Sequence, residues 1–133
     1  MVIYCNKKEK FYYVDFSATH SQLLLRSFKT GDRDYNVDII IKGVSRSILP
    51  TEINGIEISV LDDDKTIEFL QEKFSFNTEH GYLIFLIKDN IGKEYFINGL
   101  SFGIFHNQLD ILETSIGRYD FENFGELQKW YTD

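Results

Sequence analysis

The chain has 133 residues, 43% of them hydrophobic, 16% aromatic and 26% charged, which is the composition of a globular domain and not of a disordered or fibrous chain. Its formal charge of -7 disfavours binding to nucleic acid or to an anionic membrane, because both carry the same sign of charge. The single Cys, Cys5, excludes an intramolecular disulfide and suits a reducing cytoplasm, and the longest apolar run, Gly81 to Ile87, is too short to cross a bilayer.

The first part of the chain predicts β-strands. Residues 11–19 and 22–28 are rich in aromatic and aliphatic side chains, so we expect two strands joined at a short polar corner. The sequence "TGDRD" that follows is typical of a hairpin loop. Residues 35–44 alternate Val and Ile with Asp38 and Lys42, which predicts a strand with one apolar and one polar face.

A turn and a helix are expected next. In the pair Asn54-Gly55 both residues readily take a positive φ, so this pair predicts a turn over residues 50–55 that leads into another strand. In residues 62–76 the apolar side chains recur at helical spacing behind three aspartates, which suit a helix N-terminus. We therefore expect a helix in this segment.

The rest of the chain predicts two long strands and a second helix. The run "YLIFLI", residues 82–87, is apolar on both faces, and we expect it to pair with residues 95–107 at the centre of the sheet. The glycines of "NGLSFG" lack the pattern of a phosphate-binding loop and indicate a bulge or close packing. Residues 121–133 place apolar side chains along one side of a helix, although Gly125 weakens it by about 1 kcal/mol relative to Ala.

Together these elements predict an α+β fold. We expect a mostly antiparallel β-sheet of about six to eight strands with one or two covering helices. The strands follow one another too directly for alternating βαβ units, and no linker-like segment interrupts the chain. Residues 1–133 are therefore expected to form a single domain.

Polar residues near the first corner raise the question of a catalytic site. Asp15, Ser17, His20 and Ser21 have the chemistry of an acyl-transfer triad, but neither Ser has the GxSxG context that exposes a nucleophile. Ser and Asp side chains also bond backbone groups where a strand ends, so we expect a structural corner. We expect Cys5 to be buried and inert.

No metal or cofactor signature is present in the sequence. The three histidines, His20, His80 and His106, are scattered along the chain, without the close spacing that metal ligands usually show. The sequence therefore favours a non-enzymatic protein, and we assign no catalytic, cofactor-binding or metal-binding residue.

The charge is distributed unevenly along the chain. Residues 1–49 hold 8 Lys or Arg against 5 Asp or Glu, whereas residues 50–133 hold 6 against 16. An acidic surface raises the encounter rate with a basic partner. We therefore expect a module that binds a basic protein, with the candidate contacts Asp62, Asp63, Asp64, Glu113, Asp120, Glu122, Glu126 and Trp130. The alternative is a solvated acidic face that only keeps the protein soluble, with Trp130 packed in the core.

Three classes of function remain open. Size, charge and missing catalytic motifs make the chain similar to the small acidic bacterial immunity proteins that bind basic toxins, although no motif carries this analogy. The alternative is a small-ligand-binding or enzymatic domain with an aromatic-lined pocket near His20 and His106. The third class is an oligomer-forming structural domain.

Overall fold

The computed structural model describes residues 1–117 and 124–132, in which nine strands form one antiparallel sheet and one short helix is present. The strands are β1 (Val2–Ser17), β2 (Gln22–Ser27), β3 (Asn36–Lys42), β4 (Arg46–Ile48), β5 (Glu52–Val60), β6 (Leu83–Lys88), β7 (Glu94–Gly99), β8 (Ser101–Asn107) and β9 (Glu126–Thr132), and the helix is α1 (Asp64–Phe74). Their order in the sheet is β4-β7-β6-β5-β1-β2-β3-β8-β9. The predicted antiparallel sheet is confirmed, but it has nine strands instead of six to eight, and with one short helix the described chain is mostly β.

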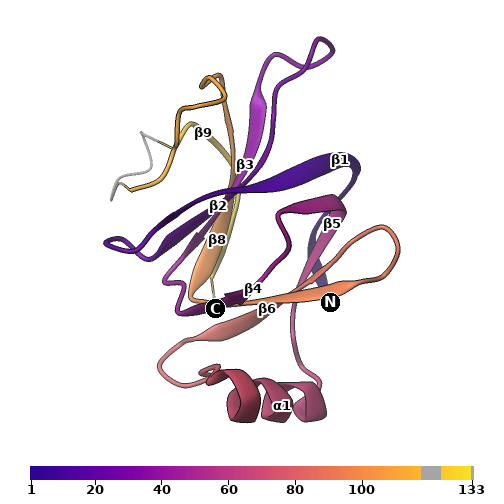
Figure 1. Ribbon diagram of the computed structural model, residues 1–133, viewed down its shortest axis with the longest axis vertical. Coiled ribbons are helices and arrows are strands. Elements are labelled where there is room, and N and C mark those ends of the chain that lie inside the picture. The colour runs from indigo at the N-terminus through magenta and orange to yellow at the C-terminus, as the bar shows by residue number, and fades with distance from the viewer. Residues whose placement is uncertain (118–123, 133) are drawn as a thin grey trace.

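The sheet is strongly curled. Only Leu100 separates β7 from β8, yet these strands lie near opposite ends of the strand order. The Leu100 N–H donates to the Lys42 carbonyl at 2.9 Å, and the Ser45 N–H donates to the Asn98 carbonyl at 2.9 Å, so both ends of the order are held together. The sheet encloses the main core, to which every strand from β1 to β8 except β4 contributes fully buried side chains (Figure 1).

Two smaller apolar clusters lie on the outer faces of the sheet. The helix α1 covers the first, which contains Leu70, Phe76 and Ile84. The segment that follows β8 covers the second, in which Leu24 and Ile116 are buried together with other side chains of β3 and β8. We call residues 108–117 of this segment the anchored loop. The two clusters lie over different strands. Figure 1 shows α1 and the segment that follows β8 at separate places on the sheet.

The helix predicted within residues 62–76 is present as α1. Its N-cap is Asp63, whose side chain accepts a hydrogen bond from the Thr66 N–H at 3.2 Å. It ends at Ser75, which has a φ of 59° and donates its N–H to the Leu70 carbonyl. Leu70 is the buried residue of α1, while Phe69 and Phe74 remain 52% and 44% exposed.

The second predicted helix is wrong in its described part. Residues 126–132 form β9, which pairs with β8, and residues 121–123 and 133 lie outside the described residues. Gly125 has a φ of 110°, a conformation that suits glycine and interrupts a helix at its predicted first turns. Tyr131 stacks on Phe102 with ring centroids 5.9 Å apart, so cross-strand packing outweighs the helical spacing.

The turn predicted at Asn54-Gly55 is also wrong, because both residues lie inside β5. Gly55 does have a positive φ, of 74°, but it stands where the pairing of β1 with β5 is irregular. A Cβ atom at Gly55 would overlap the side chain of Asn90. The glycine therefore allows a bulge in the pairing of β1 with β5 and the close approach of the Asn90 side chain, and it does not form a turn.

The pair predicted at the centre of the sheet lies near one end of the order. The β6–β7 hairpin is present, but β4 is its outer neighbour, and residues 95–107 divide into β7 and β8. The run of residues 82–87 is apolar on both faces for another reason. Phe85 and Ile87 face the main core, whereas Ile84 faces α1.

Candidate protein-docking surface

The candidate site is built on a buried ion pair between neighbouring strands. Arg26 of β2 lies directly opposite Asp38 of β3, and both side chains are 0% exposed. The Arg26 Nε donates to Asp38 Oδ1 at 2.6 Å and Nη2 donates to Oδ2 at 2.9 Å. Asp38 lies on the strand face that was expected to be polar, but the anchored loop covers this face and the carboxylate is buried.

This ion pair holds the backbone of the anchored loop. The third donor position of Arg26, Nη1, donates to the Glu113 carbonyl at 2.7 Å. Asp38 Oδ2 also accepts the Ser115 hydroxyl and the Asn107 side-chain amide, each at 2.7 Å. Among the described residues, no buried side-chain nitrogen or oxygen lacks a hydrogen-bond partner, so the network is fully satisfied.

Both ends of the anchored loop have further attachments. Near its start, the Asn36 side chain donates to the Leu109 carbonyl at 2.8 Å. At its end, the Gly117 N–H donates to Gln22 Oε1 at 2.8 Å. Between them, the Glu113 N–H donates to the Asp110 carbonyl at 2.9 Å and closes a turn. The backbone of this turn is therefore fixed from several strands.

The fixed turn presents two apolar side chains to solvent. Ile111 and Leu112 are 69% and 95% exposed. Single exposed aliphatic residues are common, but two adjacent ones on a constrained turn form a contact surface that needs little ordering when it binds. Neither residue was among the predicted contacts. The available signal is a pair of aliphatic residues between Asp110 and Glu113 in a segment without helical or strand period.

Two hollows lie on either side of Ile111. The larger, of about 460 Å³, is lined by Glu9, Lys10, Tyr12, Ser27, Phe28, Thr30 and Ile111. The smaller, of about 300 Å³, is lined by Val14, Asp15, Ile111, Leu112, Glu113 and Thr114. Because Ile111 lines both hollows, they form one continuous surface over the exposed turn and the outer side of β1. We call the residues that line the two hollows the docking surface.

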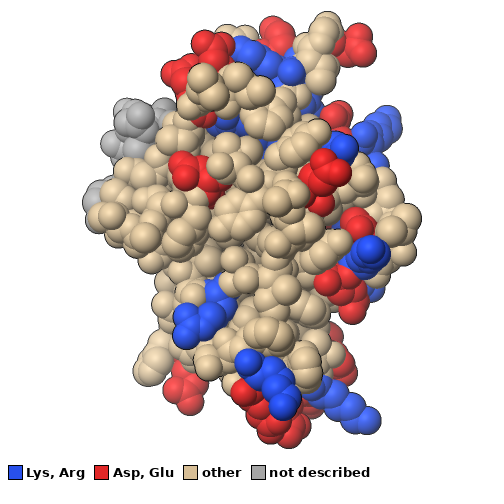
Figure 2. All heavy atoms as spheres, viewed as in Figure 1, with Lys and Arg blue, Asp and Glu red and all other residues tan. Residues whose placement is uncertain are grey.

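The predicted contact residues do not form one patch. Asp62, Asp63 and Asp64 are exposed at the start of α1, whereas Glu113 belongs to the anchored loop and Glu126 begins β9. Acidic and basic side chains are interspersed around α1 on the face that Figure 2 shows. Asp120 and Glu122 lie outside the described residues. Of the described candidates, only Glu113 lines the docking surface.

Trp130 is half-buried and packs against β8. A Cβ atom at Gly103 would lie 2.7 Å from Trp130 Cε3 and 2.6 Å from Phe105 Cε2, so the indole occupies the space that this glycine leaves free. The expectation that glycines of this segment serve close packing is confirmed here. The geometry gives Trp130 a packing role within the sheet.

The polar corner near His20 joins β1 to β2. The Ser17 Oγ and His20 Nδ1 are 3.3 Å apart, and Asp15 Oδ1 accepts the N–H of its neighbour Phe16 at 2.8 Å. Ser21 has a φ of 52° at the end of the turn. These contacts are those of a strand ending, with the Asp15 oxygen bonded to local backbone.

His106 lies at the other end of β3 from this corner. His106 pairs with Val37 near the start of β3, whereas the Ser21 carbonyl accepts the N–H of Val44, which follows that strand. The His106 ring stacks on Tyr35 with centroids 4.2 Å apart. The hollow beside it is lined by Asp34, Tyr35, His106, Asn107, Gln108 and Glu126. His20 and His106 therefore lie too far apart along β3 to line one pocket.

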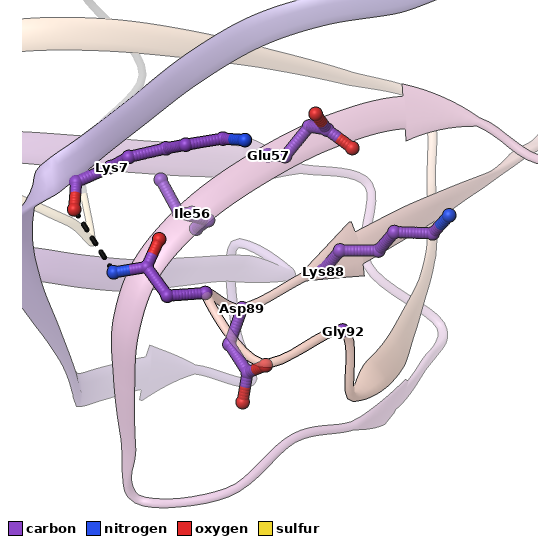
Figure 3. A pocket seen from close by; sticks show the side chains of 7 residues that line it. Lys7, Ile56, Glu57, Lys88, Asp89 and Gly92 are labelled. Carbon is purple, nitrogen blue, oxygen red and sulfur yellow. Dashed lines mark hydrogen bonds between the residues drawn. The ribbon is translucent and has the colours of Figure 1, made fainter.

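A hollow of about 230 Å³ lies beside the β6–β7 turn (Figure 3). Three of its polar side chains take part in local contacts. Asn90 Nδ2 donates to the Lys7 carbonyl at 3.0 Å, and Asp89 Oδ1 accepts the N–H groups of Ile91 and Lys93. Lys88 Nζ lies 3.7 Å from Glu94 Oε2. This hollow follows from how the turn is held, and we assign it no ligand.

The remaining candidate groups are the Cys5 thiol and possible metal ligands. Cys5 is exposed on β1, so the expectation of a buried thiol is wrong. Within residues 1–117 and 124–132, no group of three or more His, Cys, Asp or Glu residues is arranged to hold a metal ion. The described part of the chain has no helix that is both long and apolar enough to span a membrane.

Comparison with known proteins gives no match, since no family model, no curated protein and no solved structure shows significant similarity to the chain. The candidate site therefore rests on its own geometry.

Proposed function

We propose that the protein is a non-enzymatic module that binds a basic protein, and that the docking surface is its contact site. The observation that carries this proposal is the exposure of Ile111 and Leu112 on a turn whose backbone is held by a buried ion pair. Binding energy in protein interfaces concentrates in a few well-placed side chains, and a rigid backbone reduces the entropy lost on association.

The charge of the surroundings supports a basic partner. The carboxylates of Asp110 and Glu113 flank the two aliphatic residues, and Asp15 lies beside them. Of these three groups, Asp110 is paired with a cation of its own chain, since its Oδ1 lies 3.5 Å from Lys29 Nζ. The whole chain carries a charge of -7, which favours encounter with a cationic protein. In its finer form, the proposal is that of an immunity-type inhibitor that neutralises a basic toxin or enzyme by covering its surface.

The alternative of a ligand-binding or enzymatic pocket near His20 and His106 has less support. The two histidines lie at opposite ends of β3. Side chains such as Phe11, Phe85 and Phe102, each almost fully buried, pack in the main core. The aromatic content of the chain is thus used largely for packing.

Matched aspartate substitutions test the proposal. Ile111→Asp combined with Leu112→Asp places two charges on the docking surface, whereas Ile91→Asp places one on the β6–β7 turn, where Ile91 is 79% exposed. A protein captured from the native cell by the wild-type chain is purified, and its direct affinity for each variant is measured. We expect the double variant to lose about tenfold or more in affinity and Ile91→Asp to retain it.

Two outcomes would contradict the proposal. Equal affinity of all three proteins would place the contact elsewhere. A captured partner whose interacting surface is acidic would contradict the charge argument, even if the docking surface takes part. Circular dichroism and thermal unfolding of each variant establish that the fold is retained.

A further inference from the structure

The smaller hollow of the docking surface combines carboxylates with an apolar floor. Val14, which is partly buried, and the exposed Ile111 and Leu112 supply the apolar lining, and Asp15 and Glu113 supply the charge. Asp15 Oδ1 accepts the Phe16 N–H, and Glu113 Oε1 accepts the Asp110 N–H at 2.9 Å. Each bond uses one oxygen of its carboxylate and so orients the group. The second oxygen of each carboxylate takes no part in that bond.

This lining matches a long cationic side chain. A Lys or Arg side chain has an apolar stem that lies along aliphatic groups and a charged head that bonds carboxylates. Among the residues that the structure describes, no Lys or Arg lines the smaller hollow. Arg26 reaches the Glu113 carbonyl from below, but its charge is matched by Asp38. The carboxylates of the hollow are therefore complementary to a cation from another molecule.

The larger hollow has a different character. The rings of Tyr12 and Phe28 line it and contact each other, with centroids 5.5 Å apart and an interplanar angle of 52°. The charged groups at its rim are already paired. Lys10 Nζ lies 3.3 Å from Glu52 Oε2, and Glu9 Oε2 lies 3.3 Å from Arg33 Nη1. Tyr12, Phe28 and Ile111 thus offer an apolar site for an aliphatic or aromatic side chain.

We infer that the two hollows beside Ile111 recognise a short segment of the partner protein that carries an apolar or aromatic side chain close to a Lys or Arg side chain. The inference rests on the proposed function, because it specifies the chemistry of the partner at the same surface. Ile111 lies between the two recognised side chains and contacts both. The segment as a whole is held by two different physical interactions, which are separable by mutation.

Methyl-detected NMR of the full chain tests each hollow with a small probe. Nα-acetyl-lysine methylamide is expected to give saturable shifts of the Val14 and Leu112 methyl signals. Nα-acetyl-phenylalanine methylamide is expected to shift the Ile111 methyl and the ring signals of Tyr12 and Phe28. Nα-acetyl-norleucine methylamide has the lysine stem without the charge, so equal shifts of Val14 and Leu112 by this probe would overturn the cation assignment.

Charge-neutral variants separate the local effect from the overall charge. Asp15→Asn combined with Glu113→Gln keeps the acceptor oxygens that bond Phe16 and Asp110. Glu68→Gln combined with Glu72→Gln removes the same number of charges from exposed positions on α1. We expect the first pair to abolish the lysine-probe shifts, the second to retain them, and both to retain the phenylalanine-probe shifts.

The outcomes distinguish this inference from the proposed function. If the lysine probe fails to bind while the Ile111 and Leu112 aspartate variants still lose the captured partner, the inference falls and the docking surface stands. If the lysine probe binds equally to both charge-neutral variants, the attraction is not local and the inference also falls. If the probes bind as expected and the aspartate variants retain the partner, the proposed function falls, and the assignment of the segment falls with it.

Discussion

Arg26 and Asp38 are joined at two points inside the protein, with Nε 2.6 Å from Oδ1, Nη2 2.9 Å from Oδ2, and no exposure of either side chain. A buried ion pair adds little net stability compared with well-packed apolar residues. This pair has a further use, because its remaining donor and acceptor positions hold Glu113 and Ser115 of the anchored loop. We therefore connect the pair with the position of the docking surface.

The first prediction concerns the cost of breaking this pair. Asp38→Ala leaves the Arg26 guanidinium buried without its counter-charge and is expected to lower the free energy of unfolding by about 3–5 kcal/mol. Glu94→Ala removes an exposed partner of Lys88 and is expected to cost less than about 1 kcal/mol. Urea unfolding of both variants checks this difference. Similar losses would show that the buried pair is not required.

The second prediction concerns the attachment of the loop. Ser115→Ala removes a 2.7 Å hydrogen bond to Asp38 while leaving the ion pair intact. We expect a loss of about 1 kcal/mol and faster amide hydrogen exchange within the anchored loop, with α1 unchanged. Faster exchange in α1 to the same extent would mean that the serine stabilises the whole fold and not the loop.

The third prediction compares two glycines. Gly103→Ala pushes a methyl group against Phe105 and Trp130, whereas a Cβ atom at Gly31 meets nothing within 4 Å. We expect Gly103→Ala to destabilise the protein by about 1–3 kcal/mol and Gly31→Ala to change stability by less than about 0.5 kcal/mol. Thermal and urea unfolding measure both. An unaffected Gly103→Ala variant would contradict the packing role of Trp130.

Local sequence signals predicted the elements whose partners are near in the chain. The capping Asp63 and the spacing of Ile67 and Leu70 sufficed for α1, since a helix is closed by its own residues. The segment of β9 has a similar apolar spacing, but it forms a strand because β8 lies beside it. A sequence pattern gives no information about that neighbour, so the helix predicted there was wrong.

The candidate site depends even more on distant residues. Asp38 has the period of a solvent-facing strand position, and its burial follows from Ser115, which is 77 positions away in the chain. Charge alone made Glu113 a candidate contact. It did not identify Ile111 and Leu112, because an exposed aliphatic residue has the same sequence pattern as a buried one until the covering elements are known.

The fourth prediction concerns the pH dependence of stability. Burial lowers the pKa of His106 below its ordinary value of 6.5, and the carboxylate of Glu126 opposes this only in part. The unfolded chain therefore takes up a proton before the folded protein does as the pH falls. The contribution of His106 is fully present above pH 6.5 and is lost as the pH falls towards the lower folded pKa.

Urea unfolding at a series of pH values measures this contribution. His106→Phe retains an aromatic ring beside Tyr35 but does not titrate, so the stability of this variant should fall less steeply below pH 6.5 than that of the wild-type protein. His80→Phe is the control, since His80 lies in an exposed turn. Parallel pH profiles of wild type and His106→Phe would contradict the prediction.

The last prediction separates steering from contact in partner binding. Glu113→Lys reverses a charge at the docking surface and is expected to lower the association rate and its dependence on salt, whereas Leu112→Ala is expected to raise mainly the dissociation rate.

Reversal of Asp62, Asp63 and Asp64 to Lys changes the electrostatic field at α1, away from the docking surface. At about 0.1 M salt the Debye length is about 10 Å, so this reversal should change the association rate little. Near 0.01 M salt the Debye length is about 30 Å, and the reversal should then lower the association rate. Exposed charges contribute little to stability, so these variants should fold normally. An association rate that ignores both salt and Glu113→Lys would reduce the acidic surface to a solubility feature.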